Sequence, residues 1–328
     1  MQGGRLEYHE LQRAGQPGIW RPILGVLLAV GAFIGVTAAW LVPFSAYLFI
    51  QGYTADEALN TLAGVSDPTP VTLAYLNVSL ASLIPAVWLL GWALHGLKPG
   101  WLSSIRPRIR WGYFCACLLV SMVALVATVL VSLVLPDQQG TGPEVSGQLN
   151  DFTRQTRDFL VIVVFLTPLQ AAGEEYFFRG YLTQAFGGFF SHFSETAAKI
   201  LAVVVPSILF ALAHGVGQSV PIFFDRLAFG LVAGTLVILT GGLEAGIAMH
   251  VLNNLLAFGL ALAYGDIASS LSPSGGTWWS IPVTLTQSLV YLGLAVLVAR
   301  RMGLSTTADP AVLAASRGPV YRVPSARA

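Results

Sequence analysis

The chain has 328 residues, of which 55% are hydrophobic and 10% are charged, and its net charge is +1. An average soluble protein has about 25% charged residues. Because so few charged side chains cannot solvate a globule of this size, the composition excludes an ordinary soluble protein and indicates one solvated by the hydrocarbon of a membrane. The balanced charge gives no indication of a nucleic-acid partner.

Eight apolar stretches have about the 20 residues that a helix needs to cross a bilayer. They cover residues 20–50, 71–94, 111–135, 159–186, 196–215, 221–240, 243–264 and 280–299. The first exceeds the about 7–15 residues of a signal-peptide core, which favours a retained helix with a tilt or a break at Pro43. The sixth is the least secure, since Asp225 and Arg226 lie in its first turns. The sequence predicts an all-α, polytopic membrane protein.

Lysine and arginine residues fall mostly on one side of the predicted helices. If the N-terminus is cytoplasmic, the inner segments hold Arg5, Arg13, Arg21, Lys98, Arg106, Arg108, Arg110, Lys199, Arg300, Arg301, Arg317, Arg322 and Arg327. The outer segments hold only Arg154, Arg157 and Arg226. Because basic residues are enriched in cytoplasmic loops, this distribution predicts a multi-pass protein of the cell membrane with both termini cytoplasmic.

The predicted helices divide the chain into consecutive parts. These are a cytoplasmic N-terminal tail at 1–18, three helices with their loops at 19–158, a four-helix core at 159–264, a last helix at 265–302 and a cytoplasmic C-terminal tail at 303–328. Both tails are polar and rich in Pro, Gly and Ala, which predicts mobile segments.

Glu174, Glu175 and Arg179 lie together in the fourth span, between apolar flanks. A charged side chain at mid-bilayer costs about 2.5–3.5 kcal/mol on insertion scales, so such residues are typical of functional sites. Glu175 and Arg179 share a helix face, with the acid placed N-terminally, which favours an ion pair. Glu174 points about 100° away from Glu175. The pattern predicts one paired carboxylate and one free to act as a general base, and its alternative is a purely structural ion pair.

Two other spans each carry a histidine. His214 follows Phe210 by four residues in the fifth, and His250 precedes Asn254 by four in the seventh. A lone histidine in an apolar helix is more often a hydrogen-bonded core residue. His250 and Asn254 share one helix face, which favours a common site. Asn253 borders that face and is better explained as an interhelical hydrogen-bonding group.

The helix rise of about 1.5 Å per residue allows the depths of these side chains to be compared. Measured from the cytoplasmic helix ends, Glu174 lies about 18 Å deep, Asn254 about 16 Å and His250 about 10 Å. His214 lies about 28 Å deep. Contact with the other three therefore requires a helix tilt or a kink at Pro206.

Three motifs in this order resemble the signature of one family. They are Glu174-Glu175-x-x-x-Arg179, Phe210-x-x-x-His214 and His250-x-x-x-Asn254. The chain resembles the CAAX-protease and bacteriocin-processing family, also called the Abi or type II CAAX endopeptidase family, over about residues 159–264. The resemblance implies that this four-helix core is catalytic.

The resemblance further implies an intramembrane endopeptidase whose partner is a membrane-associated peptide or protein. Its eukaryotic members act on prenylated proteins, and many bacterial members are tied to peptide maturation and self-immunity. By resemblance, Glu174 would activate a water with help from His214. His250 and Asn254 would hold the developing oxyanion, a contribution of roughly 2.7–4 kcal/mol per donor in other enzymes. The supporting residues would be Glu175, Arg179 and Phe210.

The residues leave the catalytic type open between a glutamate protease and a metalloprotease. Glu174, His214 and His250 are a candidate zinc set. However, the sequence contains no H-E-x-x-H, the usual helical motif of zinc proteases. Since one acid and one histidine suffice to activate water, the metal-free version is favoured and zinc is the second candidate.

A non-catalytic membrane protein is the alternative from another class. A scaffold, an immunity factor or a transporter can use the same buried polar cluster, because intramembrane Glu, His and Arg also build ion pathways. Transporters typically have similar halves with interrupted helices, and the halves of this chain are not alike. The sequence does not name a substrate.

Overall fold

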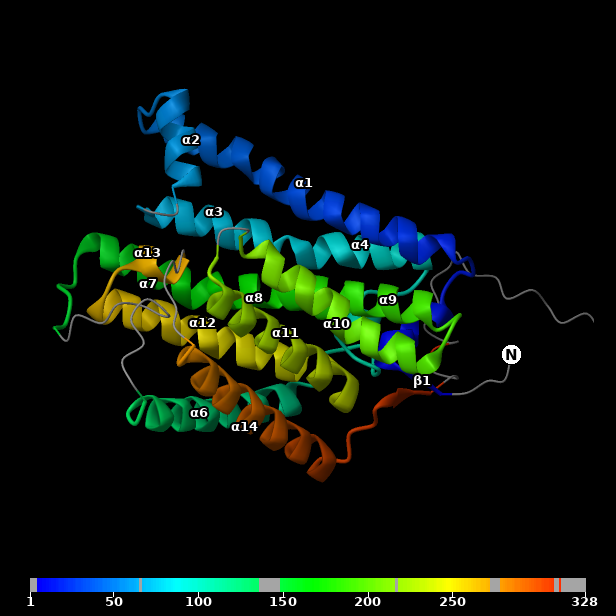
Figure 1. Cartoon of the computed structure of the whole chain (residues 1–328). Helices are drawn as coiled ribbons and strands as arrows, with labels where there is room; N and C mark the ends of the chain where they lie inside the picture. Colours follow the sequence, from blue (N-terminus) through cyan, green and yellow to red (C-terminus); the bar gives the residue numbers. More distant parts are fainter. Residues whose placement is uncertain are drawn as a thin grey trace, which may run out of the picture.

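A computed structural model describes residues 5–64, 67–135, 148–215, 218–271, 278–309 and 313. These residues form a bundle of long helices with a two-stranded sheet at one end (Figure 1). Eight helices or helix series in the described ranges are long and apolar enough to cross a membrane. The predicted all-α, polytopic fold is confirmed.

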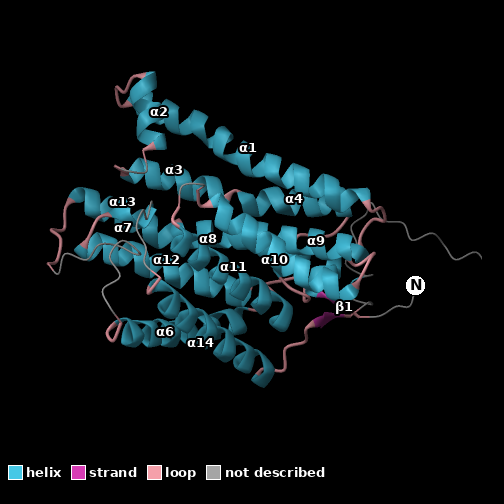
Figure 2. Ribbon diagram, in the orientation of Figure 1, coloured by secondary structure: helices cyan, strands magenta, loops and turns pink. Residues whose placement is uncertain are grey.

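The elements follow one another with short connections, and Figure 2 shows how little of the described chain is not helical. The first half contains β1 (Leu6–Glu7), the 3₁₀ helix η1 (Tyr8–Ala14), α1 (Trp20–Ile50), α2 (Ala55–Ala63), α3 (Pro70–Ala81), α4 (Leu83–His95), α5 (Gly100–Ser103) and α6 (Trp111–Ser132). The second half contains α7 (Arg154–Phe165), α8 (Thr167–Glu175), the π-helix η2 (Tyr176–Leu182), α9 (Thr183–Phe190), α10 (Glu195–Ala213), α11 (Val220–Thr240), α12 (Glu244–Tyr264), α13 (Ile267–Leu271), α14 (Ser280–Arg301) and β2 (Thr307–Ala308).

Proline residues explain where the spans are interrupted. The second span divides into α3 and α4 just before Pro85, which has no N–H for the helical hydrogen bond. The fourth span extends over Arg154–Phe190 and is interrupted at Leu166, two residues before Pro168. By contrast, α1 continues through Pro43, so the break that its length suggested is absent. Figure 1 shows α1 inclined to the neighbouring helices, in agreement with the tilt.

The fourth span lies at the centre of the bundle. Its helix α8 packs against α3 on one side and α12 on the other, while α10 contacts η2 and α9 (Figure 1). Helices α6 and α14 pack on α12 and α11, away from α1. The π-helix η2 begins directly after Glu175. Such wide turns are frequent at functional sites, and this one follows the acidic pair.

The N-terminal segment corrects the expectation of a mobile tail over 1–18. Leu6 and Glu7 pair with residues of β2, and the side chains of Tyr8 and Leu11 in η1 are completely buried. The hydroxyl of Tyr8 donates to the carbonyl of Leu102. Burial of these apolar side chains against α9 outweighs the polar composition that suggested a tail. Of the predicted C-terminal tail at 303–328, only 303–309 and 313 lie within the described residues.

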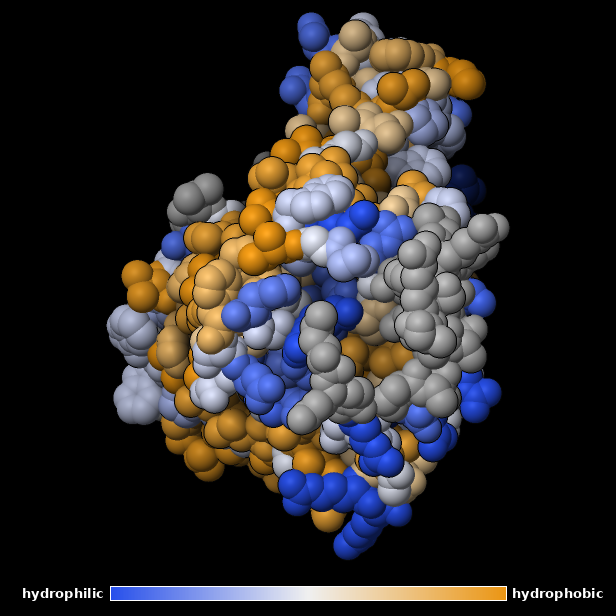
Figure 3. Space-filling view, turned by 90° about the vertical axis from the view of Figure 1, so that its right-hand side faces the viewer, coloured by the Kyte–Doolittle hydropathy of each residue, from blue (hydrophilic) through white to orange (hydrophobic). Residues whose placement is uncertain are grey.

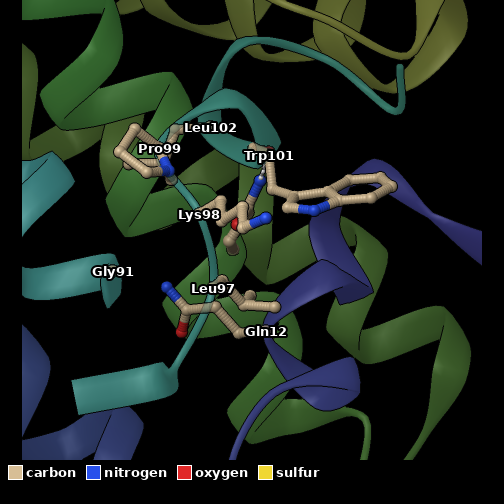
Figure 4. Close-up of a pocket in the computed structure, with 8 residues that line it drawn as sticks. Gln12, Gly91, Leu97, Lys98, Pro99, Trp101 and Leu102 are labelled. Atoms are coloured by element: carbon tan, nitrogen blue, oxygen red, sulfur yellow. Dashed lines mark hydrogen bonds between the residues drawn. The ribbon is translucent and has the colours of Figure 1, made fainter. Parts of the chain in front are cut away.

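A small cavity separates η1 from the segment before α5 (Figure 4). Its volume of about 10 Å³ is the size of a single water molecule. Gln12, Lys98 and Trp101 are among its lining residues, and none of the predicted catalytic residues lines it. The cavity therefore belongs to the packing of the N-terminal segment and is too small to admit a peptide.

Arg110 joins the beginning of α6 to the beginning of α12. Its Nε donates to Glu244 Oε1 over 2.9 Å, and one terminal nitrogen donates to Glu244 Oε2 over 2.6 Å. The other terminal nitrogen donates to the carbonyl of Thr240 over 2.8 Å. Glu244 is completely buried, so this bidentate pair compensates two charges that water does not reach.

Substitution of Arg110 by alanine is expected to destabilise the protein. Removing one partner of a buried ion pair leaves the other charge uncompensated, at a cost of about 3–5 kcal/mol. The Arg110→Ala variant should therefore unfold in detergent at a lower temperature than the wild type. Arg106→Ala is the control, because the Arg106 side chain is exposed. Equal unfolding midpoints for the two variants would contradict the role of the pair.

Candidate active site

The acidic pair occupies the end of α8, inside the bundle. Glu174 is 6% exposed, Glu175 is completely buried and Arg179 is 1% exposed. Arg179 donates to Glu175 Oε1 over 3.0 Å, which is the ion pair that their spacing predicts. The guanidinium carbon of Arg179 also lies 4.1 Å from the ring centroid of Phe210. One carboxylate is thus neutralised within its own helix, and the other is not.

Glycine at position 246 permits α12 to approach the acidic pair. A Cβ atom there would lie 2.8 Å from Glu175 Oε2, closer than real side chains come. Gly246 is one helical turn before His250, so the close approach delivers the histidine ring to the two carboxylates. Gly246 therefore positions the side chains of the site and also allows the two helices to pack closely.

His250 lies between the two carboxylates. Its Nδ1 is 2.9 Å from Glu175 Oε1, and its Nε2 is 3.6 Å from Glu174 Oε2. Because the ion-paired Glu175 can only accept, Nδ1 carries the proton and Nε2 faces Glu174. The distance of 3.6 Å is too long for a direct hydrogen bond. Among the described residues, Glu174 Oε2 is buried without a hydrogen-bond partner, so it can accept a hydrogen bond from a water or a substrate.

Gln170 links Asn254, another of the predicted residues, to this cluster. Its Nε2 donates to Glu174 Oε1 over 2.7 Å, and its Oε1 accepts from Asn254 Nδ2 over 3.1 Å. Sequence reasoning missed Gln170. The signal was available, because Gln170 precedes Glu174 by four residues and shares its helix face.

His214 contacts the cluster through the ring of Phe210. It follows the last residue of α10, and its Nδ1 lies 2.8 Å from the carbonyl oxygen of Phe210. The ring centroid of Phe210 is 4.5 Å from that of His214 and 6.0 Å from that of His250. Within the described residues, His214 forms no hydrogen bond or ion pair with Glu174. The structure brings six of the seven predicted residues together and places the ring of His214 against Phe210.

Two neighbouring residues have structural contacts. Asn253 accepts a hydrogen bond from Gln287 Nε2 of α14 over 3.1 Å, so its predicted interhelical role is confirmed. Phe229 of α11, which sequence reasoning missed, has its ring centroid 5.1 Å from that of His250. A phenylalanine in an apolar helix carries no pattern that distinguishes it from other core residues.

The candidate zinc ligands do not close around a metal position. Glu174 Oε2 and His250 Nε2 face one another, but His214 is bonded to its own helix at Phe210. Over the described ranges, no group of three or more His, Cys, Asp or Glu residues is arranged to hold a metal ion. As placed here, the residues do not fit the three-ligand zinc site considered from the sequence.

Fold and site together define a multi-pass membrane protein with a buried acid–histidine cluster. Residues 156–256, which include all three motifs, match the family model described as type II CAAX prenyl endopeptidase Rce1-like. This match confirms the resemblance to the CAAX-protease and bacteriocin-processing family that the three motifs predict.

Curated relatives extend the likeness beyond the core. The chain is 25% identical over 299 residues to the uncharacterized protein YyaK of Bacillus subtilis, covering 86% of this chain and 93% of that protein. It is 23% identical over 245 residues to the membrane-embedded CAAX protease MroQ of Staphylococcus aureus, covering 72% of this chain and 87% of that protein. No solved structure matches the chain significantly.

The two adjacent glutamates should differ in their effect on stability. Glu175→Ala leaves Arg179 buried without its partner and should lower the free energy of unfolding by about 3–5 kcal/mol. Glu174→Ala keeps the direct ion pair between Glu175 and Arg179 and should cost much less. Thermal unfolding of both purified variants checks the difference. Identical midpoints would mean that the Glu175–Arg179 pair does not stabilise the fold.

Proposed function

We propose that the chain is an intramembrane endopeptidase that hydrolyses a peptide bond of a membrane-associated protein or peptide. The observation that carries the proposal is the pair of atoms Glu174 Oε2 and His250 Nε2, which face each other at 3.6 Å inside the bundle. A water between them would meet one carboxylate and one imidazole nitrogen. The match to the type II CAAX prenyl endopeptidase model and the name of the relative MroQ, a membrane-embedded CAAX protease, support the same activity.

In the proposed mechanism, Glu174 takes a proton from the water while the oxygen of that water attacks the carbonyl carbon of the scissile peptide bond. Asn254 donates an N–H to the oxyanion, and His250, held by Glu175 through Nδ1, donates to the same oxyanion from Nε2 when that nitrogen also carries a proton. Glu174 then gives its proton to the amine nitrogen as the C–N bond breaks. His214 remains a proposed catalytic residue, because catalytic hydrogen bonds often tighten only when substrate binds.

The proposed orientation has both termini in the cytoplasm. Strands β1 and β2 pair, so the two ends of the described chain meet at one end of the bundle, as an even number of spans requires. Figure 3 views that end and shows hydrophilic side chains gathered on it. The exposed basic residues of the elements there include Arg13, Lys98, Lys199, Arg300 and Arg301. The excess of basic residues at this end of the bundle supports its position on the cytoplasmic side.

The substrate is proposed to be of the CAAX type or the peptide-maturation type. Arginine is preferred over lysine, and Ala, Gly and Val are abundant, which indicates a bacterial genome of high GC content. Prenylated proteins would then be unusual substrates, so membrane peptides that are trimmed or matured are favoured. Mass spectrometry of membrane peptides from cells with the wild type or with Glu174→Gln would identify the fragments whose release requires the enzyme.

Glu174→Ala and His214→Ala should each abolish cleavage without reducing the amount of folded protein. General acid–base residues contribute about 10²–10⁴-fold to a rate, so the loss should be clear in assays on purified protein. His192→Ala is the control, since His192 is exposed at the end of α9. Unchanged turnover in the Glu174 variant would refute the peptidase assignment and favour a scaffold, an immunity factor or a transporter.

The catalytic type can be decided by metal analysis. Under the glutamate mechanism, the purified protein should remain active after treatment with a chelator and should contain no stoichiometric zinc in elemental analysis. Activity that is lost on chelation and regained with added zinc would instead assign a metalloprotease, with Glu174, His214 and His250 as the candidate ligands.

A further inference from the structure

We infer that Gln170 is a positioning residue that fixes the orientations of Glu174 and Asn254, a role in catalysis that rests on the proposed function. Gln170 lies on α8 and is 8% exposed. Its amide nitrogen is 2.7 Å from Glu174 Oε1, and its amide oxygen is 3.1 Å from Asn254 Nδ2. One side chain therefore bridges the proposed base and the proposed oxyanion donor, which belong to different helices.

The direction of these hydrogen bonds follows from the chemistry of the three groups. An ionised carboxylate only accepts, so the amide nitrogen of Gln170 must face Glu174 and the amide oxygen must face α12. That oxygen needs a donor, and this turns Asn254 Nδ2 toward Gln170. An asparagine amide has two N–H donors. The second N–H of Asn254 forms no hydrogen bond in the described part of the chain and is available for an oxyanion.

The backbone that carries Gln170 is held firmly by α3. Asn77 Nδ2 donates to Thr167 Oγ1 over 3.0 Å, one turn before Gln170. Gly173, one turn after it, has no room for a Cβ because the carbonyl of Leu80 occupies that position. Helix α8 is thus fixed in register against α3, and the Gln170 side chain spans a defined distance to α12.

The chain offers a matched control for this bridge. Gln287 of α14 donates to Asn253 over 3.1 Å, so it also forms a glutamine–asparagine hydrogen bond to α12, one residue away and in the opposite direction. Gln287 has no contact with Glu174 among its described hydrogen bonds. Replacement by methionine keeps the length of each side chain; it removes the bond of Gln287 to Asn253, and it removes the bonds of Gln170 to Asn254 and Glu174.

Turnover of a membrane-anchored synthetic peptide, chosen because its cleavage requires Glu174, tests the catalytic role. Gln170→Met should lower kcat by roughly 10- to 100-fold, the range found for outer partners that orient metal ligands. KM should be unchanged, because the lost orientation matters only in the transition state. Gln287→Met should leave kcat within about 2-fold of the wild type. Wild-type kcat in Gln170→Met would overturn the inference.

A double variant separates positioning from general destabilisation. If Gln170 acts through Asn254, most of its effect should vanish in the Asn254→Ala background, so that the double variant is within about 2-fold of Asn254→Ala. A purely structural role would instead lower the rate by the same factor in both backgrounds. Fully multiplicative losses would therefore contradict the positioning of Asn254 by Gln170.

The structure of full-length Gln170→Met, determined by cryo-electron microscopy, gives a readout that does not depend on activity. The Asn254 side chain should leave its present rotamer, while in Gln287→Met it should stay. If the wild type cleaves nothing and Asn254 still moves, the proposed function fails and the positioning by Gln170 stands. An unmoved Asn254 would overturn the positioning whether or not the protein is a peptidase.

Discussion

The buried ion pair between Glu175 and Arg179 is the interaction on which the rest of the site depends. An uncompensated charge would be too costly inside this apolar bundle, and the pair removes that cost within a single helix. A neutralised Glu175 can then accept the proton of His250 Nδ1, which turns Nε2 toward Glu174. The neighbouring carboxylate of Glu174 forms no ion pair with Arg179. The pair thus separates two chemically identical side chains into a support and a candidate base.

Close backbone contacts complete this arrangement. Gly173 brings α8 against α3, and Gly246 brings α12 against Glu175. A larger side chain at either position would separate helices that must touch. The aromatic rings of Phe210 and Phe229 then surround His250 and cover the guanidinium of Arg179. Apolar walls of this kind limit the number of water molecules at the site and strengthen the electrostatic interactions inside it.

Much of the fold could be predicted from the sequence because its causes are local. Span length depends on consecutive apolar residues, and the Glu175–Arg179 pair depends on helical periodicity. The hydrogen bond between Gln170 and Asn254 and the ion pair of Arg110 with Glu244 join residues 84 and 134 positions apart, and no local pattern predicts them. The role of His214 stays a prediction. Depth along a straight helix could not show how its ring packs, and in the structure that ring lies against Phe210.

The pairing of β1 with β2 has a consequence for biosynthesis. Residues 6 and 7 precede all eight spans in the sequence, and their partners at 307 and 308 follow only after the eighth span. During translation, β1 therefore cannot pair with β2 until every membrane helix has been synthesised. The pairing closes a loop that contains all eight spans, so it is a late step of assembly. A change in β1 would therefore act on this late pairing.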